Sequence, residues 1–316
     1  MHINENTAAD ILIPVYKPDD KLECLLQGLS RQSERIGKVI IMYTKQGLED
    51  IFPKEIFDRY SETLYLDIHE LERNEFDHGG TRALGMEYAS SDVVICMTQD
   101  AIACDKELVL RLVLALCEEG VVAAYARQMP GADSNLIECF TREFNYPAET
   151  VIKSKKDIET MGIKAFFCSN VCAAYNREVY CKLGGFIKQT IFNEDMIFAR
   201  KIIDNGYKIC YCSQAKVIHT HNYTAIQQFH RNFDLAVSQA MNKDVFEGIS
   251  SESEGIKYVK TAYSYFSARG KAYLMIPFLY GCCFKYLGYK LGKKYDRLPM
   301  WLVTKCSMNS DFFKKN

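Results

Sequence analysis

Short apolar runs alternate with amphipathic segments over most of the first 240 residues. An apolar run at 11–15 is followed by leucines, from Leu22 to Leu29, that recur with the period of a helix, and a second apolar run occupies 38–43. This order of strand, helix and strand is the βαβ unit of a parallel sheet. The pattern therefore predicts an α/β fold.

The same alternation continues along the chain. The run at 92–97 is apolar after its first residue, which predicts a central strand that is buried on both faces. Loop-rich stretches around 129–131 and 145–147 interrupt the pattern, and loops of this kind often carry a second substrate. We expect a mostly parallel sheet with further strands at 63–68, 121–126 and 208–212, and helices at 80–88, 106–117 and 195–205.

The end of the chain, residues 241–316, predicts a basic and aromatic helical extension of the first domain, residues 1–240. Residues 256–316 contain twelve Lys or Arg against two acidic residues, and fourteen aromatic residues. The apolar run at 272–284 is interrupted by Pro277 and is shorter than the roughly 20 residues that span a bilayer. Two interpretations stay open: a segment that lies on an anionic membrane surface, or a cap packed on the main domain.

Composition narrows the class of protein. With 316 residues, 48% hydrophobic and 25% charged, the chain predicts one large core with a smaller appended unit. The 13 cysteines lie mostly in apolar segments without the spacing of zinc sites, and the N-terminus has no pattern of a secretion signal. These features predict a reduced, cytoplasmic compartment. With a net charge of −1, we expect no nucleic-acid partner.

Asp100 is the first candidate for chemistry. It follows the apolar strand that ends at Met97, at the carboxyl edge where open α/β sheets bind ligands. A carboxylate there can hold a divalent cation, which can neutralise a diphosphate. An acidic residue after a strand is also a common turn former, so position alone leaves both roles open.

Two predicted helix starts carry further candidates. The first, at 76–85, combines Gly80 with Arg82, whose guanidinium suits phosphate oxygens, although a surface ion pair would explain it equally well. The second begins near Glu194 and Asp195. A carboxylate there could accept the proton of a substrate hydroxyl, or it could simply interact with the helix dipole.

His219 and His221 follow the apolar residues 215–218, and alternate residues of a strand point to the same side. The pair could bind a metal, contact phosphate, or be hydrogen-bonded structural residues. The sequence pattern alone does not separate these roles.

Taken in order, the segments resemble inverting nucleotide-sugar glycosyltransferases of family 2 over residues 8–235. Members have the GT-A fold, a Rossmann-like nucleotide-sugar-binding sandwich. The resemblance implies nucleotide-sugar-binding roles for Pro14, Val15, Tyr16, Thr44, Gly80, Arg82, Gln99 and Asp100, metal-binding roles for Asp100 and His219, acceptor-side roles for Asn145, Tyr146, Gly185 and Phe186, and catalytic roles for Asp195, the base, and Glu194.

Within this family, the stretches HGGTR, TQDA, NED and HTHNY resemble bacterial rhamnosyltransferases. Thr98 replaces the first acid of the family's DxD metal motif, which leaves Asp100 with His219 to hold the cation. The subgroup implies transfer of L-rhamnose from dTDP-β-L-rhamnose, with Mg²⁺ or Mn²⁺, to a polysaccharide or lipid-linked saccharide at the cytoplasmic face of the plasma membrane.

Two alternative functions are compatible with the same residues: transfer of another sugar from a UDP or dTDP donor, and a non-catalytic binding subunit with the GT-A fold. A nucleotidyltransferase is disfavoured, because Pro14 and Pro18 make the first loop rigid and it lacks the glycines of a pyrophosphate loop.

Overall fold

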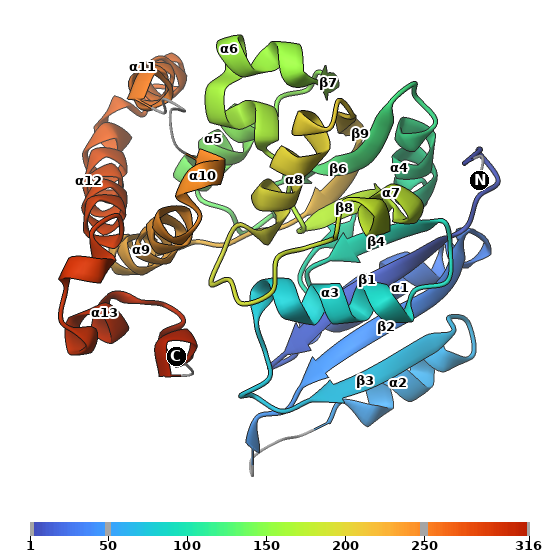
Figure 1. Ribbon diagram of the computed structural model, residues 1–316. Coiled ribbons are helices and arrows are strands. Elements are labelled where there is room, and N and C mark those ends of the chain that lie inside the picture. The colour runs from blue at the N-terminus through green and yellow to red at the C-terminus, as the bar shows by residue number, and fades with distance from the viewer. Residues whose placement is uncertain (1–2, 48–51, 247–251, 315–316) are drawn as a thin grey trace.

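A nine-stranded sheet forms the centre of the computed structural model, which describes residues 3–47, 52–246 and 252–314. The strand order is β3-β2-β1-β4-β8-β6-β9-β5, with β7 paired to β9 (Figure 1). The strands are β1 Ala9–Tyr16, β2 Ile36–Thr44, β3 Leu66–Leu71, β4 Val93–Met97, β5 Ile102–Ala103, β6 Val121–Met129, β7 Val151–Lys153, β8 Cys172–Asn176 and β9 Lys208–Ile218.

The first half of the sheet is parallel from β3 through β2 and β1 to β4. β8 then runs antiparallel between β4 and β6, and β6 and β9 are again parallel. This mixed sheet confirms the predicted α/β class. The carboxyl ends of β1, β2 and β4 lie at one edge, where ligands of open α/β sheets bind.

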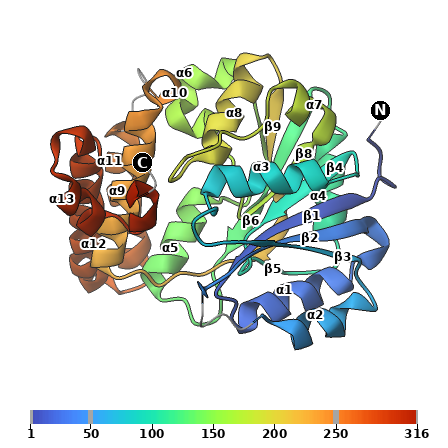
Figure 2. The same ribbon diagram turned by 60° about the horizontal axis from the view of Figure 1, so that its bottom comes forward.

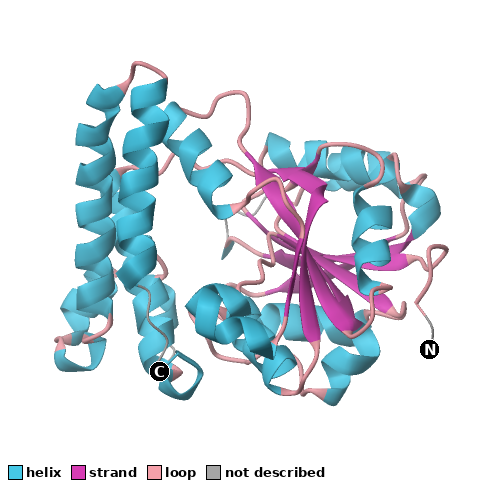
Figure 3. Cartoon of the chain, turned by 90° about the horizontal axis from the view of Figure 1, so that it is seen from above, coloured by secondary structure: helices cyan, strands magenta, loops and turns pink. Residues whose placement is uncertain are grey.

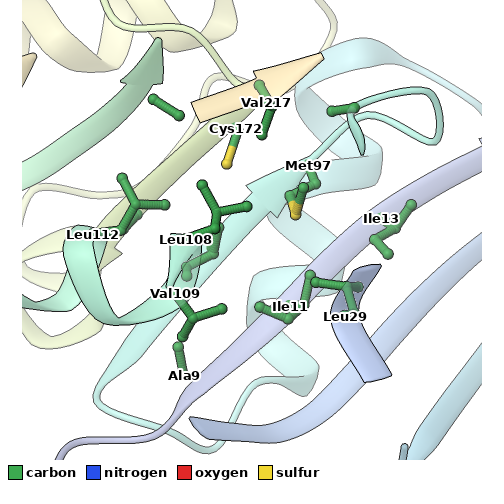
Figure 4. Packing of buried hydrophobic residues seen from close by; sticks show 14 of the residues in the cluster. Ala9, Ile11, Ile13, Leu29, Met97, Leu108, Val109, Leu112, Cys172 and Val217 are labelled. Atoms are coloured by element: carbon green, nitrogen blue, oxygen red, sulfur yellow. The ribbon is translucent and has the colours of Figure 1, made fainter. Parts of the chain in front are cut away.

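Helices cover both faces of the sheet, as Figure 3 shows from above. On one face, α1 and α4 pack on β1, β4 and β9 through side chains such as Leu29, Leu108 and Leu112, which meet Ile11 and Met97 (Figure 4). On the other face lie α3, α7 and α8. The helices before the extension are α1 Asp20–Ser30, α2 Lys54–Ser61, α3 His78–Tyr88, α4 Leu108–Leu116, α5 Leu136–Asn145, α6 Ile158–Met161, α7 Arg177–Lys182 and α8 Glu194–Asp204.

The remaining helices form a separate layer beside α5, away from the N-terminus (Figure 2). They are α9 Ala225–Met241, α10 Lys243–Phe246, α11 Glu252–Ala268, α12 Met275–Gly292 and α13 Met300–Cys306, followed by a 3₁₀ turn at Ser310–Lys314. α9 and α12 are in intimate contact, because a Cβ on Gly288 would lie 2.2 Å from the carbonyl oxygen of Phe229. α9 falls before the predicted boundary at 240 but packs with the extension, so that boundary stays a prediction.

The predicted helical extension is present, and it packs on the first domain. Phe266 of α11 and Phe278 of α12 enclose Phe140 of α5, with ring centroids 5.6 and 5.7 Å away. The sequence predicted loops around 129–131 and 145–147, and α5 fills the interval between them. None of the helices in the described part of the chain combines the length and the apolarity needed to cross a membrane.

Candidate active site

Three metal-ligating side chains meet where β4 and β9 end. Asp100 lies in the turn between β4 and β5, and β5 pairs antiparallel with β9, so Asp100 faces the end of β9 and the histidines that follow it. Oδ2 of Asp100 is 3.1 Å from Nε2 of His221 and 3.5 Å from Nε2 of His219. One ligand atom from each residue lies within 4.8 Å of the others. We refer to these three residues as the metal cluster.

Residues around the cluster fix the tautomer of His219. Its Nδ1 lies 2.9 Å from Oε1 of Gln128, which also accepts a hydrogen bond from Arg142. An amide oxygen only accepts, so Nδ1 of His219 carries the proton and Nε2 keeps a lone pair. That lone pair faces Nε2 of His221, 2.9 Å away. Two imidazole nitrogens and a carboxylate oxygen converging in this way fit a divalent cation.

The protonation states of the cluster suit a cation as well. Burial lowers the pKa of His219 to about 4, so the ring is neutral at neutral pH. Burial alone would raise the pKa of Asp100, but the two imidazoles beside its carboxylate outweigh burial and hold this pKa well below its ordinary value. The carboxylate is therefore ionised and the imidazole of His219 is neutral, as metal ligands must be.

Asp195 stands at the first turn of α8 with its carboxylate at the cavity that contains the metal cluster. Its Oδ2 accepts from the backbone N–H of Asn170 at 3.1 Å, and its Oδ1 from that of Met196 at 2.7 Å. Burial, and after it the negative charge of Glu194, raises the pKa of Asp195 to about 7. A carboxylate with a pKa near neutrality is well suited to general-base catalysis.

Glu194 and Arg82 bind each other. Nη1 of Arg82 is 3.0 Å from Oε1 of Glu194, and both side chains are only 7% exposed. The same oxygen accepts from Nδ2 of Asn170 at 3.1 Å, and Oδ1 of Asn170 accepts from the hydroxyl of Tyr175. Arg82 thus has its charge compensated within the protein, and Glu194 is oriented toward Arg82. The ion pair that the sequence left as an alternative for Arg82 is present, buried and not at the surface.

The start of α3 differs from the expected anion site. The side chain of Asp77 caps the helix, and its Oδ1 accepts from the N–H groups of Gly79 and Gly80 at 2.8 and 2.7 Å. These amides are therefore already hydrogen-bonded to a carboxylate and do not offer a free nest for phosphate. Gly79 is required for packing, because a Cβ there would lie 1.9 Å from the carbonyl oxygen of Ile187.

Three cavities follow one another along the carboxyl edge of the sheet. The central cavity, of about 190 Å³, contains the metal cluster and Asp195. It shares His78 with the β1–β2 cavity, of about 330 Å³, which Tyr16 and Thr44 line. On its other side it shares Asp195 and both histidines with the α5–α9 cavity, also about 330 Å³. The arrangement can hold an extended ligand on one side of the cluster and a second ligand on the other.

Of the residues predicted to bind the nucleotide sugar, Tyr16 and Thr44 line the β1–β2 cavity, and Gln99 and Asp100 lie in the turn after β4. Gln99 joins these two places, since its Oε1 accepts from the N–H of Tyr16 at 2.8 Å and its Nε2 donates to the carbonyl of Tyr16 at 3.0 Å. Thr44 is buried, and its hydroxyl has no hydrogen-bond partner in the described protein. Pro14 and Val15 precede Tyr16 in β1 and pair with β2 inside the sheet, which fixes the position of Tyr16.

The residues predicted on the acceptor side separate. Asn145 and Tyr146 line the α5–α9 cavity. Phe186 lies instead in the core, 3% exposed, with its ring against Tyr180 and Phe198. Gly185 adopts a φ of 59° beside Tyr180, which a side chain would clash with. The structure thus gives both residues a packing role.

Sequence reasoning left two parts of the site incomplete. The resemblance gave a metal-binding role to His219 and not to His221, yet His221 lies closer to Asp100. Arg231 of α9 lines both the central and the α5–α9 cavities, and no carboxylate of the described residues forms an ion pair with it. A helix position carries no local signal for such a role. The alternation from His219 to His221 was a signal for the second histidine.

A cavity of about 360 Å³ around Lys153 lies elsewhere. It includes Asn145 but none of Asp100, Asp195 and the histidines. Apolar and aromatic side chains make most of its wall, and its lining residues include no carboxylate, imidazole or thiol. We therefore place the candidate active site in the central cavity and its two neighbours.

Comparison with protein families gives an independent result. The family model described as glycosyl transferase family 2 matches residues 10–184. The O-antigen chain rhamnosyltransferase RfbN of Salmonella typhimurium is 34% identical over 305 residues, which are 96% of this chain and 95% of that protein. The O-antigen chain rhamnosyltransferase WbaN of Salmonella anatum is 40% identical over 242 residues, 76% of each chain.

Solved structures are similar in fold. The mannosyltransferase PcManGT of Pyrobaculum calidifontis, in complex with GDP-Man and Mn²⁺, has a TM-score of 0.64 at 15% identity and covers 93% of this chain and 88% of its own. TarS 1–349 of S. aureus in complex with UDP-GlcNAc has a TM-score of 0.53 at 14% identity and covers 92% of this chain and 91% of its own. At these identities the likeness concerns the fold alone.

Proposed function

The chain belongs to glycosyl transferase family 2, and from this premise we propose that it transfers L-rhamnose from dTDP-β-L-rhamnose to a saccharide of a bacterial O-antigen chain. Both curated relatives carry the name O-antigen chain rhamnosyltransferase, and the alignment with the first spans nearly the whole of both chains. The enzyme class follows from the family. The sugar, the donor base and the acceptor are the proposal.

The observation that carries it is the order of the three cavities around Asp195. The β1–β2 cavity takes the nucleoside, the central cavity the diphosphate and the sugar, and the α5–α9 cavity the acceptor. Asp195 belongs to the central and α5–α9 cavities at once. It therefore stands between an acceptor hydroxyl and the sugar that this hydroxyl attacks.

In this mechanism Asp195 accepts the proton of the acceptor hydroxyl as its oxygen attacks the anomeric carbon. The bond from that carbon to the diphosphate breaks on the opposite face, and the electron pair leaves with the diphosphate. The configuration inverts, so a β-L-rhamnosyl donor gives an α-L-rhamnoside. Holding both substrates in line supplies much of the rate enhancement.

Asp100, His219 and His221 would hold a divalent cation that neutralises the charge developing on the diphosphate. We infer Mn²⁺ in preference to Mg²⁺, because two of the three ligands are imidazoles, which bind Mg²⁺ poorly. Arg231 adds positive charge at the same cavity. Glu194 keeps Arg82 paired and raises the pKa of the base, so its role is to orient and not to react.

We further propose that the protein works at the inner face of the plasma membrane, held there by its extension. In the described structure α12 and α13 expose large apolar side chains, among them Ile276 at 76% and Trp301 at 67%. Exposed Lys290 and Lys294 lie on the same extension. Aromatic and aliphatic groups beside cations are typical of interfacial attachment to anionic lipid.

Asp195→Asn tests the proposal. The change is nearly isosteric, so the variant should bind dTDP and Mn²⁺ as the unchanged protein does, while transfer from dTDP-β-L-rhamnose falls by at least about 10²-fold. Release of dTDP, with O-antigen saccharide as acceptor, is the assay. Transfer at a near-normal rate would remove Asp195 as the base. Activity with another nucleotide sugar and none with this one would change the donor but keep the mechanism.

A further inference from the structure

The β1–β2 cavity has two walls that lie far apart in the sequence. The inner wall comes from the carboxyl ends of β1 and β2, with Tyr16 and Thr44, and from residues between β3 and α3. The outer wall is residues 308–312, close to the end of the chain, and we refer to it as the C-terminal wall. Figure 1 shows the red end of the chain on the side toward which β1 and β2 point.

A buried carboxylate fixes the start of the C-terminal wall. Asp234 of α9 is 3% exposed, and its Oδ2 accepts from the N–H of Met308 at 2.9 Å and from that of Asn309 at 3.0 Å. Hydrogen bonds from two backbone amides to one carboxylate are strong, and their loss would leave a buried acid without these hydrogen-bond partners, which is unfavourable. Phe312 packs in a cluster with Ile191 and Phe233. The C-terminal wall is therefore an integral part of the fold.

An ion pair joins the two walls. Nη2 and Nε of Arg73 lie 2.6 and 3.0 Å from Oδ2 of Asp311, 238 positions later in the sequence. The side chains are 59% and 33% exposed, so this pair is weak enough to open. The cavity behind it has a volume of about 330 Å³, within the usual range for small-molecule sites.

Polar groups without partners line both walls of the cavity. The hydroxyl of Thr44, a side chain only 2% exposed, has no hydrogen-bond partner in the described structure. The side chains of Asn309 and Ser310 line the opposite wall and make no hydrogen bond within the described residues. A pyrimidine base presents both an N–H donor and carbonyl acceptors along one edge, and a hydroxyl with an amide can satisfy both kinds of group.

We propose that the C-terminal wall completes the nucleoside pocket of the donor, with Asn309 reading the edge of a pyrimidine base. This rests on the proposed function for the choice of a nucleotide as ligand. The extension thereby takes part in donor binding, in addition to its contact with the α5–α9 cavity. The cavity reaches the metal cluster through His78, so base and diphosphate can be held in one extended ligand.

Calorimetry on the full chain with Mn²⁺ tests the wall with three probes: dTDP, UDP and inorganic pyrophosphate. Pyrophosphate can bind at the metal cluster but has no nucleoside. Asn309→Ala should weaken the binding of dTDP about fivefold or more, as expected for one lost hydrogen bond, and leave the affinity for pyrophosphate unchanged. If Asn309→Ala weakens the binding of UDP as much as that of dTDP, Asn309 contacts the edge that both bases share. If it weakens the binding of dTDP more, Asn309 contributes to the recognition of thymine. Both results support a role of the C-terminal wall in nucleoside binding.

The ion pair gives a second test that does not depend on Asn309. Arg73→Gln and Asp311→Asn should each weaken dTDP about two- to fivefold, and the exchanged pair Arg73→Asp with Asp311→Arg should restore part of the affinity. Asp296→Asn removes the same charge from the same extension without touching the cavity, and should have no effect.

Two results would overturn the inference: unchanged dTDP affinity in Asn309→Ala and Asp311→Asn, or pyrophosphate weakened as much as dTDP. The first means that the nucleoside does not touch the C-terminal wall, and the second that the variants act through the metal cluster or the fold. If the unchanged protein binds neither dTDP nor UDP with Mn²⁺, the proposed function itself fails.

Discussion

Neighbouring groups shift the pKa values of the two acids of the central cavity in opposite directions. Two imidazoles face Asp100 and keep its pKa far below the ordinary value, whereas burial beside Glu194 raises the pKa of Asp195 to about 7. Two carboxyl groups whose pKa values are shifted in opposite directions commonly take different roles in one reaction. Asp100 remains an anion for a cation to bind, and Asp195 can exchange a proton near neutral pH.

Glu194→Gln should shift the pH dependence of transfer. The base must be deprotonated, so kcat/KM falls as the pH drops through the raised pKa of Asp195, about 7. Removing the negative charge of Glu194 lowers that pKa, which moves the acidic limb to lower pH while the plateau rate at high pH changes less. A pH profile of kcat/KM measures both. An acidic limb that stays in place, with a plateau lost by about 10²-fold, would make Glu194 a reacting group.

Both histidines should matter for the metal. His219→Ala and His221→Ala are each expected to weaken Mn²⁺ binding by about tenfold or more, since each removes one of three converging ligands. Gln128→Leu should weaken Mn²⁺ binding less, because it removes only the hydrogen bond that fixes the tautomer of His219. Titration of Mn²⁺ and of Mg²⁺ into the full chain measures the affinities. Equal affinity for the two ions would contradict the imidazole contribution.

Single residues of the site were predictable where they follow a strand. Asp100 and His219 were candidates because they follow apolar runs, and the family resemblance gave them metal-binding roles. The metal cluster brings them together. Arg82 was assigned to the nucleotide sugar and Glu194 to catalysis, and they lie 3.0 Å apart because α3 and α8 share one face of the sheet. A contact between two helices depends on how they pack, and neither helix carries it in its own sequence.

At the scale of whole elements, periodicity identified the strands that are long and apolar. β8 was missed: its five residues, Cys172–Asn176, are too few to show a period, although it lies between β4 and β6. α5 was also missed, since Pro130 and Pro147 on either side of it signalled loops. Its hydrophobic face is covered by α11 and α12, which a local reading cannot anticipate.

The contact of α9 with α12 makes two glycines of one helix behave in opposite ways. Gly288→Ala should destabilise the protein by about 1–3 kcal/mol, because its Cβ would lie 2.2 Å from a backbone carbonyl that cannot rotate away. Gly281→Ala meets nothing within 4 Å, and should be neutral or stabilising by up to about 1 kcal/mol through helix propensity. Denaturant unfolding of both variants measures the difference. Similar stabilities would mean that α12 is not in tight contact with α9.

At the scale of the molecule, the extension faces in two directions. Its inner face carries Lys285, which lines the α5–α9 cavity and has no ion pair with any described carboxylate. Lys285 is one of the twelve basic residues of 256–316 that the sequence offered to a membrane surface. The turn of α12 instead places it on the same face as Gly288. The sequence also left a cap and a membrane anchor as alternatives. The packing on Phe140 makes the extension a cap, and membrane attachment stays a proposal about its outer face.

That outer face is a continuous stripe along α12. Ile276, Leu279, Tyr280 and Leu287 recur at helical spacing and are 42–76% exposed, with Lys290 at the end of the stripe. Exposed apolar stripes of this kind mark an interaction surface. Neighbouring cations favour an anionic one, at about 1 kcal/mol for each Lys or Arg near the lipid surface. We therefore expect the full chain to bind vesicles containing phosphatidylglycerol at low salt, and to leave them at high salt.

The test needs surface changes and not truncation, because removal of α11 and α12 would expose Phe140. Ile276→Ser with Trp301→Ser should reduce co-sedimentation with anionic vesicles by about tenfold or more, as roughly 1.5–3 kcal/mol per buried side chain implies. Tyr65→Ser is the matched control, since Tyr65 is 69% exposed on the first domain and should not affect binding. Donor hydrolysis should be unchanged in both variants. If the full chain ignores anionic vesicles, or if Tyr65→Ser releases it equally, the stripe serves a protein partner or none, and attachment to the membrane through α12 and α13 is wrong.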